Sequence, residues 1–170
     1  MSQARSCVKD IPSYRGMNIL TPTVWKNSVF TSTYRNNAFL VSLKAGSGGW
    51  SADFSWTTKT QAYMSSPIIV GDYVYLHLQN ERFACVDLAT GEETWRTTPF
   101  GKYWSMVTNG KNILSLDEAG DLRLIAANPD KYTLLDEKHV SDNRVGLTWR
   151  LQAHKYSSAV NAGWMPTTSK

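Results

Sequence analysis

The strongest constraint on the fold of this chain is an internal repeat with a period of about 40 residues. Two apolar stretches around a polar turn occur at Thr21–Thr31 and again at Ser66–Leu76, 45 residues later. A third copy turns at Asn109–Asn112, and Gly71 and Gly110 are 39 residues apart. Each turn contains Gly, Asn or Asp, which tolerate positive φ, so each copy predicts a β-hairpin.

Two more strands are expected in each copy. The third strands are Phe39–Leu43, Phe83–Asp87 and Leu122–Ala126, and the fourth end at Trp56 and Trp95 or span Tyr132–Leu135. The 7 Trp and 8 Tyr residues favour sheets, and no segment shows a helical period. Four antiparallel strands per repeat are typical of a propeller blade. We therefore predict an all-β fold of about three four-stranded antiparallel blades, incomplete and unclosed.

The most specific motif lies at the end of the second copy. Cys85–Trp95 resembles the tryptophan-docking repeat of the PQQ-like (quinoprotein alcohol dehydrogenase-like) β-propellers, usually Ala-x-Asp-x-x-Thr-Gly-Lys-x-x-Trp. Asp87, Thr90, Gly91 and Trp95 match that pattern, while Cys and Glu replace its usual Ala and Lys. The family includes quinoprotein alcohol dehydrogenases and the outer-membrane-assembly lipoprotein.

These four residues are predicted to be structural. Asp87 and Thr90 can hydrogen-bond the backbone of the turn, Gly91 supplies positive φ, and Trp95 can bury its ring between neighbouring sheets. No catalytic, cofactor-binding or metal-binding residue is predicted.

The repeat divides the chain into five segments. Residues 1–20 are the end of a preceding blade or loop; the blades are 21–60, 61–100 and 101–142; and 143–170 is an unpatterned tail. Complete propellers of this family have about seven or eight blades, so the resemblance implies a fragment or a truncated product. Codons shifted by one base across Val145–Ser158 permit a fourth hairpin of the same template, so the tail is either frameshifted or a divergent loop.

Several kinds of site find little support. The net charge of +4 is scattered, which argues against nucleic-acid binding, and there is no apolar signal peptide and no membrane-spanning run. Cys7 and Cys85 belong to no metal or haem pattern, and Cys85 is expected to be buried in a strand.

The polar side chains of the second and third copies suggest no catalytic site either. His77 is expected to face solvent or a partner, and it is widely spaced in sequence from His139 and His154. Asp117, Glu118 and Asp121 are interpreted as solvated turn residues rather than metal ligands. Tyr103 and Trp104 are expected to pack, although a ligand contact is the alternative.

Three functions are compatible with this pattern. The leading hypothesis is a non-catalytic scaffold that binds a protein or ligand, with a protein partner or the remaining blades as its contacts. The resemblance implies a bacterial protein with a periplasmic or other extracytoplasmic location. The alternatives are a fragment of a PQQ-dependent dehydrogenase, which would require PQQ and calcium, and a truncated product without its own function. No cofactor is otherwise evident.

Overall fold

The fold was taken from a computed structural model, which describes residues 20–33 and 37–142. Within these residues the chain forms twelve strands and no helix. The strands make three four-stranded antiparallel sheets in sequence order. The first sheet contains β1 (Thr23–Trp25), β2 (Ser28–Ser32), β3 (Ala38–Gly46) and β4 (Gly49–Thr58). The second contains β5 (Ile68–Val70), β6 (Tyr73–His77), β7 (Phe83–Asp87) and β8 (Glu93–Arg96). The third contains β9 (Ser105–Thr108), β10 (Asn112–Leu116), β11 (Asp121–Ala126) and β12 (Thr133–His139).

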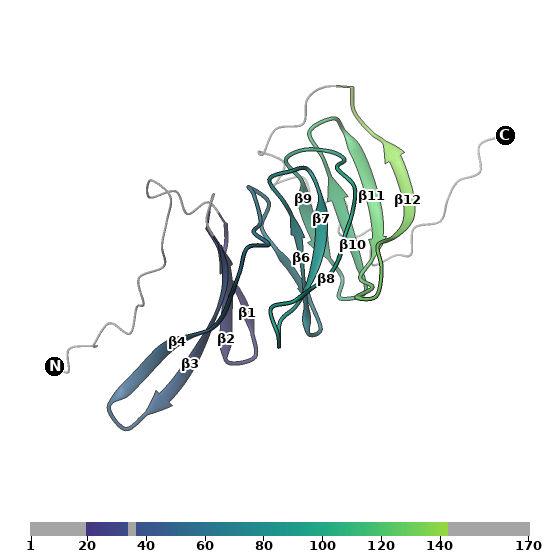
Figure 1. The fold of residues 1–170 in the computed structure, drawn as a ribbon. Coiled ribbons are helices and arrows are strands. Elements are labelled where there is room, and N and C mark those ends of the chain that lie inside the picture. The colour runs from purple at the N-terminus through teal and green to yellow at the C-terminus, as the bar shows by residue number, and fades with distance from the viewer. Residues whose placement is uncertain (1–19, 34–36, 143–170) are drawn as a thin grey trace.

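The three sheets are successive blades of an unclosed propeller, as the repeat predicted. They stand side by side in Figure 1, and the first strands contact one another, β1 with β5 and β5 with β9. We refer to the sheets as blades one, two and three. The expected end of a preceding blade at 1–20 and the possible frameshift at 143–170 lie outside the described residues, apart from Leu20.

The same irregularity recurs in every blade. The register between the third and fourth strands shifts between Leu40 and Val41, between Cys85 and Val86, and between Leu124 and Ile125. Such a shift marks a β-bulge, which bends the outer strand and increases its twist. The repeat is therefore structural as well as sequential, because the bulge occupies the equivalent position each time.

Two hydrophobic cores hold the blades together. The core between blades one and two includes Phe30, Leu40, Val74 and Leu76, and the core between blades two and three includes Tyr75, Phe83, Cys85, Ile113 and Ile125. Successive residues of β6 thus enter different cores, because side chains alternate across a strand. Blade two is consequently buried on both faces.

This arrangement corrects the expectation for His77. Instead of facing solvent or a partner, the side chain is buried, with an exposed fraction of 1%. Alternation with apolar neighbours indicates an exposed face only where one side of a sheet is in water, and blade two has no such side. The expectation that Cys85 is buried in a strand is confirmed.

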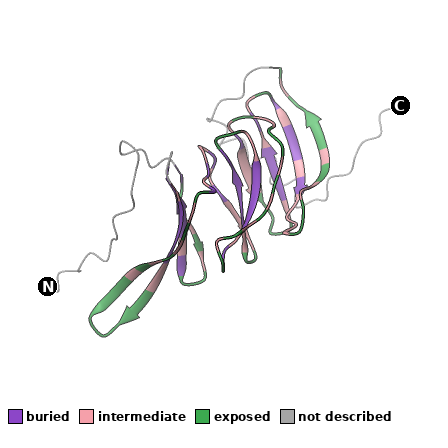
Figure 2. Ribbon diagram, in the orientation of Figure 1, coloured by how far each residue is buried: buried purple, intermediate pink, exposed green. Residues whose placement is uncertain are grey.

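One hairpin extends beyond its blade. β3 and β4 have 9 and 10 residues, against 5 and 4 for β7 and β8 in blade two. The extra length is exposed and projects away from the other blades (Figures 1 and 2), with Gly49 at φ 116° in its turn. Trp50 lies on this projection and is 64% exposed. The sequence does not predict the extension, because Gly and Ser at 46–49 indicate a turn but not the length of the strands on either side of it.

Candidate functional site

The turn that carries the sequence motif is closed by its own side chains. The Asp87 carboxylate accepts hydrogen bonds from the backbone N–H groups of Ala89 (2.6 Å) and Thr90 (3.2 Å). The Thr90 hydroxyl accepts one from the N–H of Glu92 at 3.2 Å. Gly91 adopts φ 79°, a conformation that favours glycine, and its N–H donates to the carbonyl of Asp87 at 2.8 Å.

Tryptophans cross from each blade to the next. The indole N–H of Trp56 in blade one donates to the carbonyl of Leu88 in blade two at 2.9 Å. A Cβ at Gly91 would lie only 2.7 Å from the Trp56 ring, so the ring lies directly against the glycine. Trp95 repeats this contact one blade on, donating to the carbonyl of Asn128 at 3.0 Å.

Blade three lacks the third tryptophan. Trp56 and Trp95 each follow the bulge of the outer strand, paired with Leu40 and Cys85. The same register places Asp136 of β12 opposite Leu124. The face of blade three that points away from blade two therefore presents a carboxylate where the other blades present an indole.

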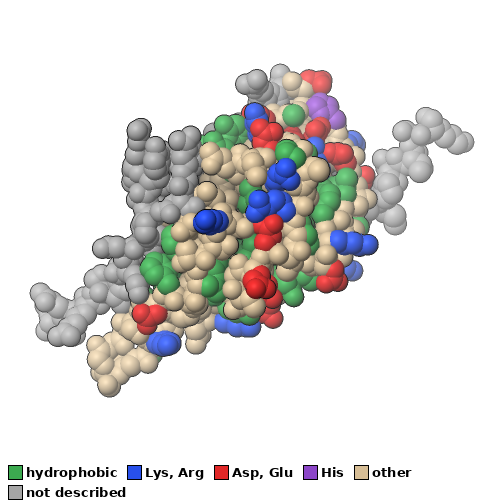
Figure 3. Space-filling model, viewed as in Figure 1, with side chains coloured by type: hydrophobic (Ala, Val, Ile, Leu, Met, Phe, Trp, Pro, Cys, Tyr) green, Lys and Arg blue, Asp and Glu red, His purple; other side chains and the backbone are tan. Residues whose placement is uncertain are grey.

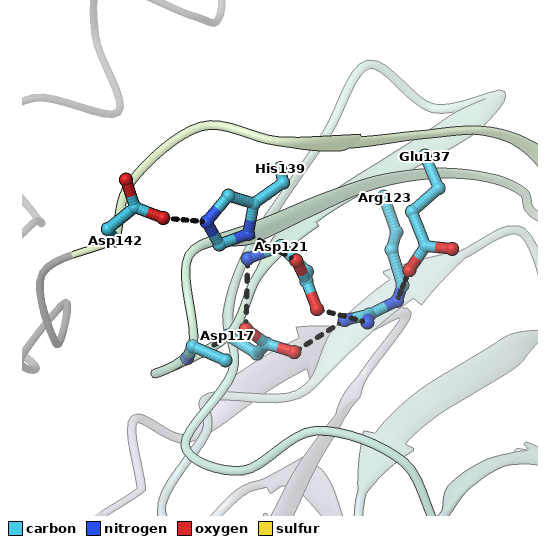
Figure 4. Close-up of polar contacts among 7 residues, drawn as sticks. Asp117, Asp121, Arg123, Glu137, His139 and Asp142 are labelled. Carbon is cyan, nitrogen blue, oxygen red and sulfur yellow. Dashed lines mark hydrogen bonds and ion pairs between the residues drawn. The ribbon is translucent and has the colours of Figure 1, made fainter.

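A cluster of charges surrounds Arg123 in blade three (Figure 4). Its guanidinium contacts Asp117 at 2.6 Å, Asp121 at 3.1 Å and Glu137 at 2.6 Å. The Arg123 side chain is 8% exposed and that of Asp117 only 1%. Burial alone would lower the pKa of Arg123, but the hydrogen bond and negative charge of Asp117 raise it. The guanidinium also lies 5.2 Å from the centre of the Phe100 ring.

Asp117 is therefore not the solvated turn residue that the sequence suggested. Its Oδ1 does hold the turn, accepting from the N–H groups of Ala119 (2.9 Å) and Asp121 (3.0 Å). Its Oδ2 is neutralised by Arg123 in a buried ion pair. The prediction was wrong because Asp117 is paired with Arg123 on the following strand. The spacing of the two residues in the sequence does not show that the Arg123 side chain extends over the loop.

His139 extends this cluster towards solvent. Its two ring nitrogens lie 2.8 Å from Asp121 and 3.0 Å from Asp142 (Figure 4). The hydrogen bonds to Asp121 and then Asp142 raise the pKa of His139. The side chain is half exposed, and of its two carboxylate partners Asp121 also pairs with Arg123.

A hollow of about 190 Å³ lies where blades two and three meet. It is lined by the loop after β6 and by the segments that enter β5 and β9: Tyr63, His77, Leu78, Gln79, Glu81, Lys102 and Tyr103. The rings of Tyr63 and Tyr103 stack with their centres 5.8 Å apart. Lys102 pairs with Glu81 at 3.1 Å, which raises the pKa of the lysine. We call this the inter-blade hollow.

The imidazole of His77 belongs to the inter-blade hollow. Its Nε2 lies 3.1 Å from the carbonyl of Gly101, and its ring stacks on Trp104 with centres 4.9 Å apart. A carbonyl can only accept, so Nε2 carries the proton and Nδ1 is a bare acceptor. Burial lowers the pKa of His77 to about 4, so the ring is neutral at pH 7.

Tyr103 and Trp104 were both expected to pack, with a ligand contact as the alternative, but the two side chains lie in different surroundings. Trp104 is buried in the core between the blades, whereas Tyr103 lines the inter-blade hollow. Tyr63, Glu81 and Lys102 were not foreseen as site residues. The positive φ of Glu81 (62°) and Tyr103 (51°) is a property of the fold that their residue types do not signal.

The described residues do not fit calcium or a redox metal. Within 20–33 and 37–142, no group of three or more His, Cys, Asp and Glu side chains is placed to hold a metal ion. The buried carboxylate of Asp117 is neutralised by Arg123, and burial raises the pKa of the Cys85 thiol to about 11. The absence of a cofactor remains a prediction.

Basic and acidic side chains alternate on the face shown in Figure 3. In the part of the chain that the structure describes, no helix is long and apolar enough to cross a membrane.

Comparison with known families gives one sequence match. Residues 15–97 match the family model described as outer membrane protein assembly factor BamB. This range covers blade one and the Asp87–Trp95 motif of blade two. A comparison with curated protein sequences gives no match.

Solved structures share the fold at low identity. The chain is similar to BamB from Moraxella catarrhalis, with a TM-score of 0.56 and 16% identity, over 72% of this chain and 34% of that one. It is also similar to the computationally designed Ika8 protein, with a TM-score of 0.57 and 10% identity, over 73% of this chain and 37% of that one. The N-terminal domain of Nup159 gives a TM-score of 0.51 and 11% identity, over 71% and 30% of the two chains.

The chain thus spans between a third and two fifths of the length of BamB and Ika8. At these identities the solved structures show the fold alone. The similarity in sequence comes from the family model, which matches residues 15–97. The repeated blades, the Asp87–Trp95 motif and the match to the BamB family together identify the chain as a PQQ-like β-propeller repeat protein.

Proposed function

We propose that the chain is part of a bacterial, periplasmic PQQ-like propeller that acts as a non-catalytic scaffold for a protein partner. The observation that carries this proposal is the projecting β3–β4 hairpin with its exposed Trp50. Tryptophan is enriched in the residues that dominate binding at protein interfaces. A large ring held in water on an ordered hairpin has no role in the core of its own blade, whereas a partner could bury it.

The remaining blades supply rigidity. In this proposal Trp56 and Trp95 dock each blade onto the next, which keeps the hairpin at a fixed angle to blades two and three. The match to a family described as an assembly factor supports a protein partner and a location outside the cytoplasm. Fold alone does not determine function, so the hairpin needs a direct test.

Site-specific photo-crosslinking in the native organism provides that test. A photoreactive amino acid would replace Trp50, and the matched control would carry it at Thr57, an exposed residue on the same strand within the blade. We expect one discrete protein adduct from position 50 and none from position 57. The partner, once purified, should bind Trp50→Ala at least about tenfold more weakly than the wild type. Identical adducts from both positions, or unchanged affinity, would contradict the proposal.

Cell fractionation tests the location separately. The chain, detected by antibody, is expected in the periplasmic or membrane fraction and to be degraded by protease added to osmotically shocked cells. Recovery in the cytoplasmic fraction, protected from that protease, would contradict a periplasmic scaffold.

The absence of catalysis is tested with the cofactor of the quinoprotein dehydrogenases. We expect no saturable binding when PQQ and Ca²⁺ are titrated into the chain, and no reduction of an artificial electron acceptor in the presence of alcohols or aldehydes. PQQ-dependent reduction of the acceptor would overturn the non-catalytic assignment in favour of the dehydrogenase alternative.

A further inference from the structure

The inter-blade hollow has the chemical character of a site for a neutral ligand. The two charges at its edge, Glu81 and Lys102, neutralise each other at 3.1 Å. His77 is neutral because its ring is buried, and its Nε2–H donates to the carbonyl of Gly101. The hollow therefore offers both donors and acceptors without a net charge.

Aromatic and apolar surfaces form the rest of the wall. The Tyr103 ring stacks with Tyr63, which fixes its orientation, and Leu78 adds an apolar contact. Aromatic faces beside hydrogen-bonding groups suit a ligand that is apolar on one face and polar around its rim. The pyranose ring of a sugar has this character, because its axial C–H groups form an apolar face and its hydroxyls project from the edge.

Backbone strain is concentrated in the same place. Glu81 and Tyr103 both adopt positive φ (62° and 51°) without being glycine. Conformations of this kind persist where the surrounding structure enforces them, and they are common at ligand sites. Two of the three non-glycine residues with positive φ in the described chain line this one hollow.

The buried His77 adds an unsatisfied acceptor. Its Nδ1 has no hydrogen-bond partner among the described residues. Leaving a buried polar atom unpaired is unfavourable, so Nδ1 requires a hydrogen-bond donor that the described residues do not supply.

The size of the inter-blade hollow limits the ligand. At about 190 Å³ it is larger than one water, which occupies about 30 Å³ in the liquid, and smaller than the roughly 300–1,000 Å³ of drug-sized sites. We propose that the inter-blade hollow binds a single neutral sugar ring, which packs on Tyr103 and hydrogen-bonds to Glu81, Lys102 and Gln79. This site is independent of the proposed protein contact at Trp50.

Saturation-transfer NMR on the full chain tests the proposal, with D-glucose and N-acetylglucosamine as the probes. We expect saturation transfer to the ring protons of at least one sugar, with a Kd no weaker than about 10 mM. Tyr103→Asn removes the ring but keeps a residue that tolerates positive φ, and Lys102→Ala removes the donor. Both should weaken binding by at least about tenfold. Lys111→Ala, in the β9–β10 turn at the opposite end of blade three, is the matched lysine control and should bind like the wild type.

Each other outcome contradicts the site. No transfer to either sugar at about 10 mM would overturn the proposal. Binding that survives Tyr103→Asn and Lys102→Ala in chains that retain the wild-type circular dichroism spectrum would place the sugar elsewhere and overturn it too. Loss of sugar binding would leave crosslinking at Trp50 unaffected, so the two proposals can fail separately.

Discussion

Arg123 shows how one side chain can determine the stability of a whole blade. It brings together Asp117 from the β10–β11 loop, Asp121 from its own strand and Glu137 from β12. The buried Asp117 depends on it, because a charge removed from water needs a close partner. The cluster holds the loop, the inner strand and the outer strand of blade three in one arrangement.

Replacing Arg123 should therefore be costly. We expect Arg123→Met to lower the free energy of unfolding by about 3–5 kcal/mol, the usual effect of leaving a buried partner unpaired. Arg96→Met removes the partly exposed pair with Glu93 and should cost about 1 kcal/mol or less. Urea denaturation followed by tryptophan fluorescence measures both. Equal effects would show that burial of the Asp117 pair has no energetic consequence.

His77 and His139 should respond to acid with opposite signs. The pKa of His77 in the folded chain is lowered to about 4 by burial, although the charges of Glu81 and Asp117 favour protonation and that of Arg123 opposes it. Since the unfolded chain binds a proton near pH 6.5, stability is lost as the pH falls from about 6.5 towards 4, by up to roughly 3 kcal/mol. The raised pKa of His139 has the reverse effect, and its contribution is present below about pH 6.5 and lost as the pH rises through the folded value.

The comparison of His77→Gln with the wild type isolates the first effect. Unfolding free energies at pH 7 and pH 4.5 should differ less in the variant, which has no imidazole to protonate in the unfolded state. His139→Gln should instead lose more stability than the wild type between these pH values. An unchanged pH dependence in His77→Gln would mean that the buried ring does not resist protonation.

At the scale of elements, the contact between blades is made by a ring and a glycine. Trp56 lies against Gly91 and donates to Leu88, and Trp95 makes the corresponding bond to Asn128. The bulge before each tryptophan bends the outer strand at that point. The sequence motif therefore supplies one side of the contact, at Gly91, and Trp56 of the preceding blade supplies the other.

Gly91→Ala tests this contact. The substitution combines positive φ with a Cβ 2.7 Å from the Trp56 ring, so we expect a loss of stability of about 1–3 kcal/mol from backbone strain together with a shift of the Trp56 emission spectrum. Gly71→Ala is the control, because Gly71 also has positive φ (61°) but open space around its Cβ position. It should lose stability without altering the emission of Trp56. The same spectral shift in both variants would argue against the close approach of ring and glycine.

At the scale of the whole molecule, one face of blade three has no further blade against it among the described residues. Asp136 replaces the docking tryptophan, and Leu134 and Leu135 on the same edge strand are 42% and 50% exposed. An uncovered strand edge with apolar side chains is prone to pair with another chain.

We therefore expect the 170-residue chain to self-associate as its concentration rises. Sedimentation velocity over a range of concentrations should show species larger than the monomer, and Leu134→Lys combined with Leu135→Lys should restore the monomer, because lysine on an edge strand opposes pairing. A wild-type chain that remains a single monomeric species, and unfolds cooperatively, would show that three blades are self-sufficient.

The sequence by itself determined the local elements. Repeated hairpins with Gly, Asn or Asp at their turns predicted three four-stranded sheets, and Asp87, Thr90 and Gly91 indicated a turn whose hydrogen bonds are made within a few residues. Such features depend on contacts close in sequence, which is why the fold class and the position of each sheet could be predicted.

Only the tertiary structure decided which side chains meet. The stacking of blade three on blade two buries His77. Asp117 in the β10–β11 loop is buried against the Arg123 side chain of β11. The inter-blade hollow joins Tyr63, Glu81 and Tyr103 from three separate connections. These sites depend on how far one sheet is rotated and shifted against the next, and on strand lengths such as that of the projecting hairpin. A period in the sequence carries neither quantity, because it specifies the order of the strands and not the distances between them.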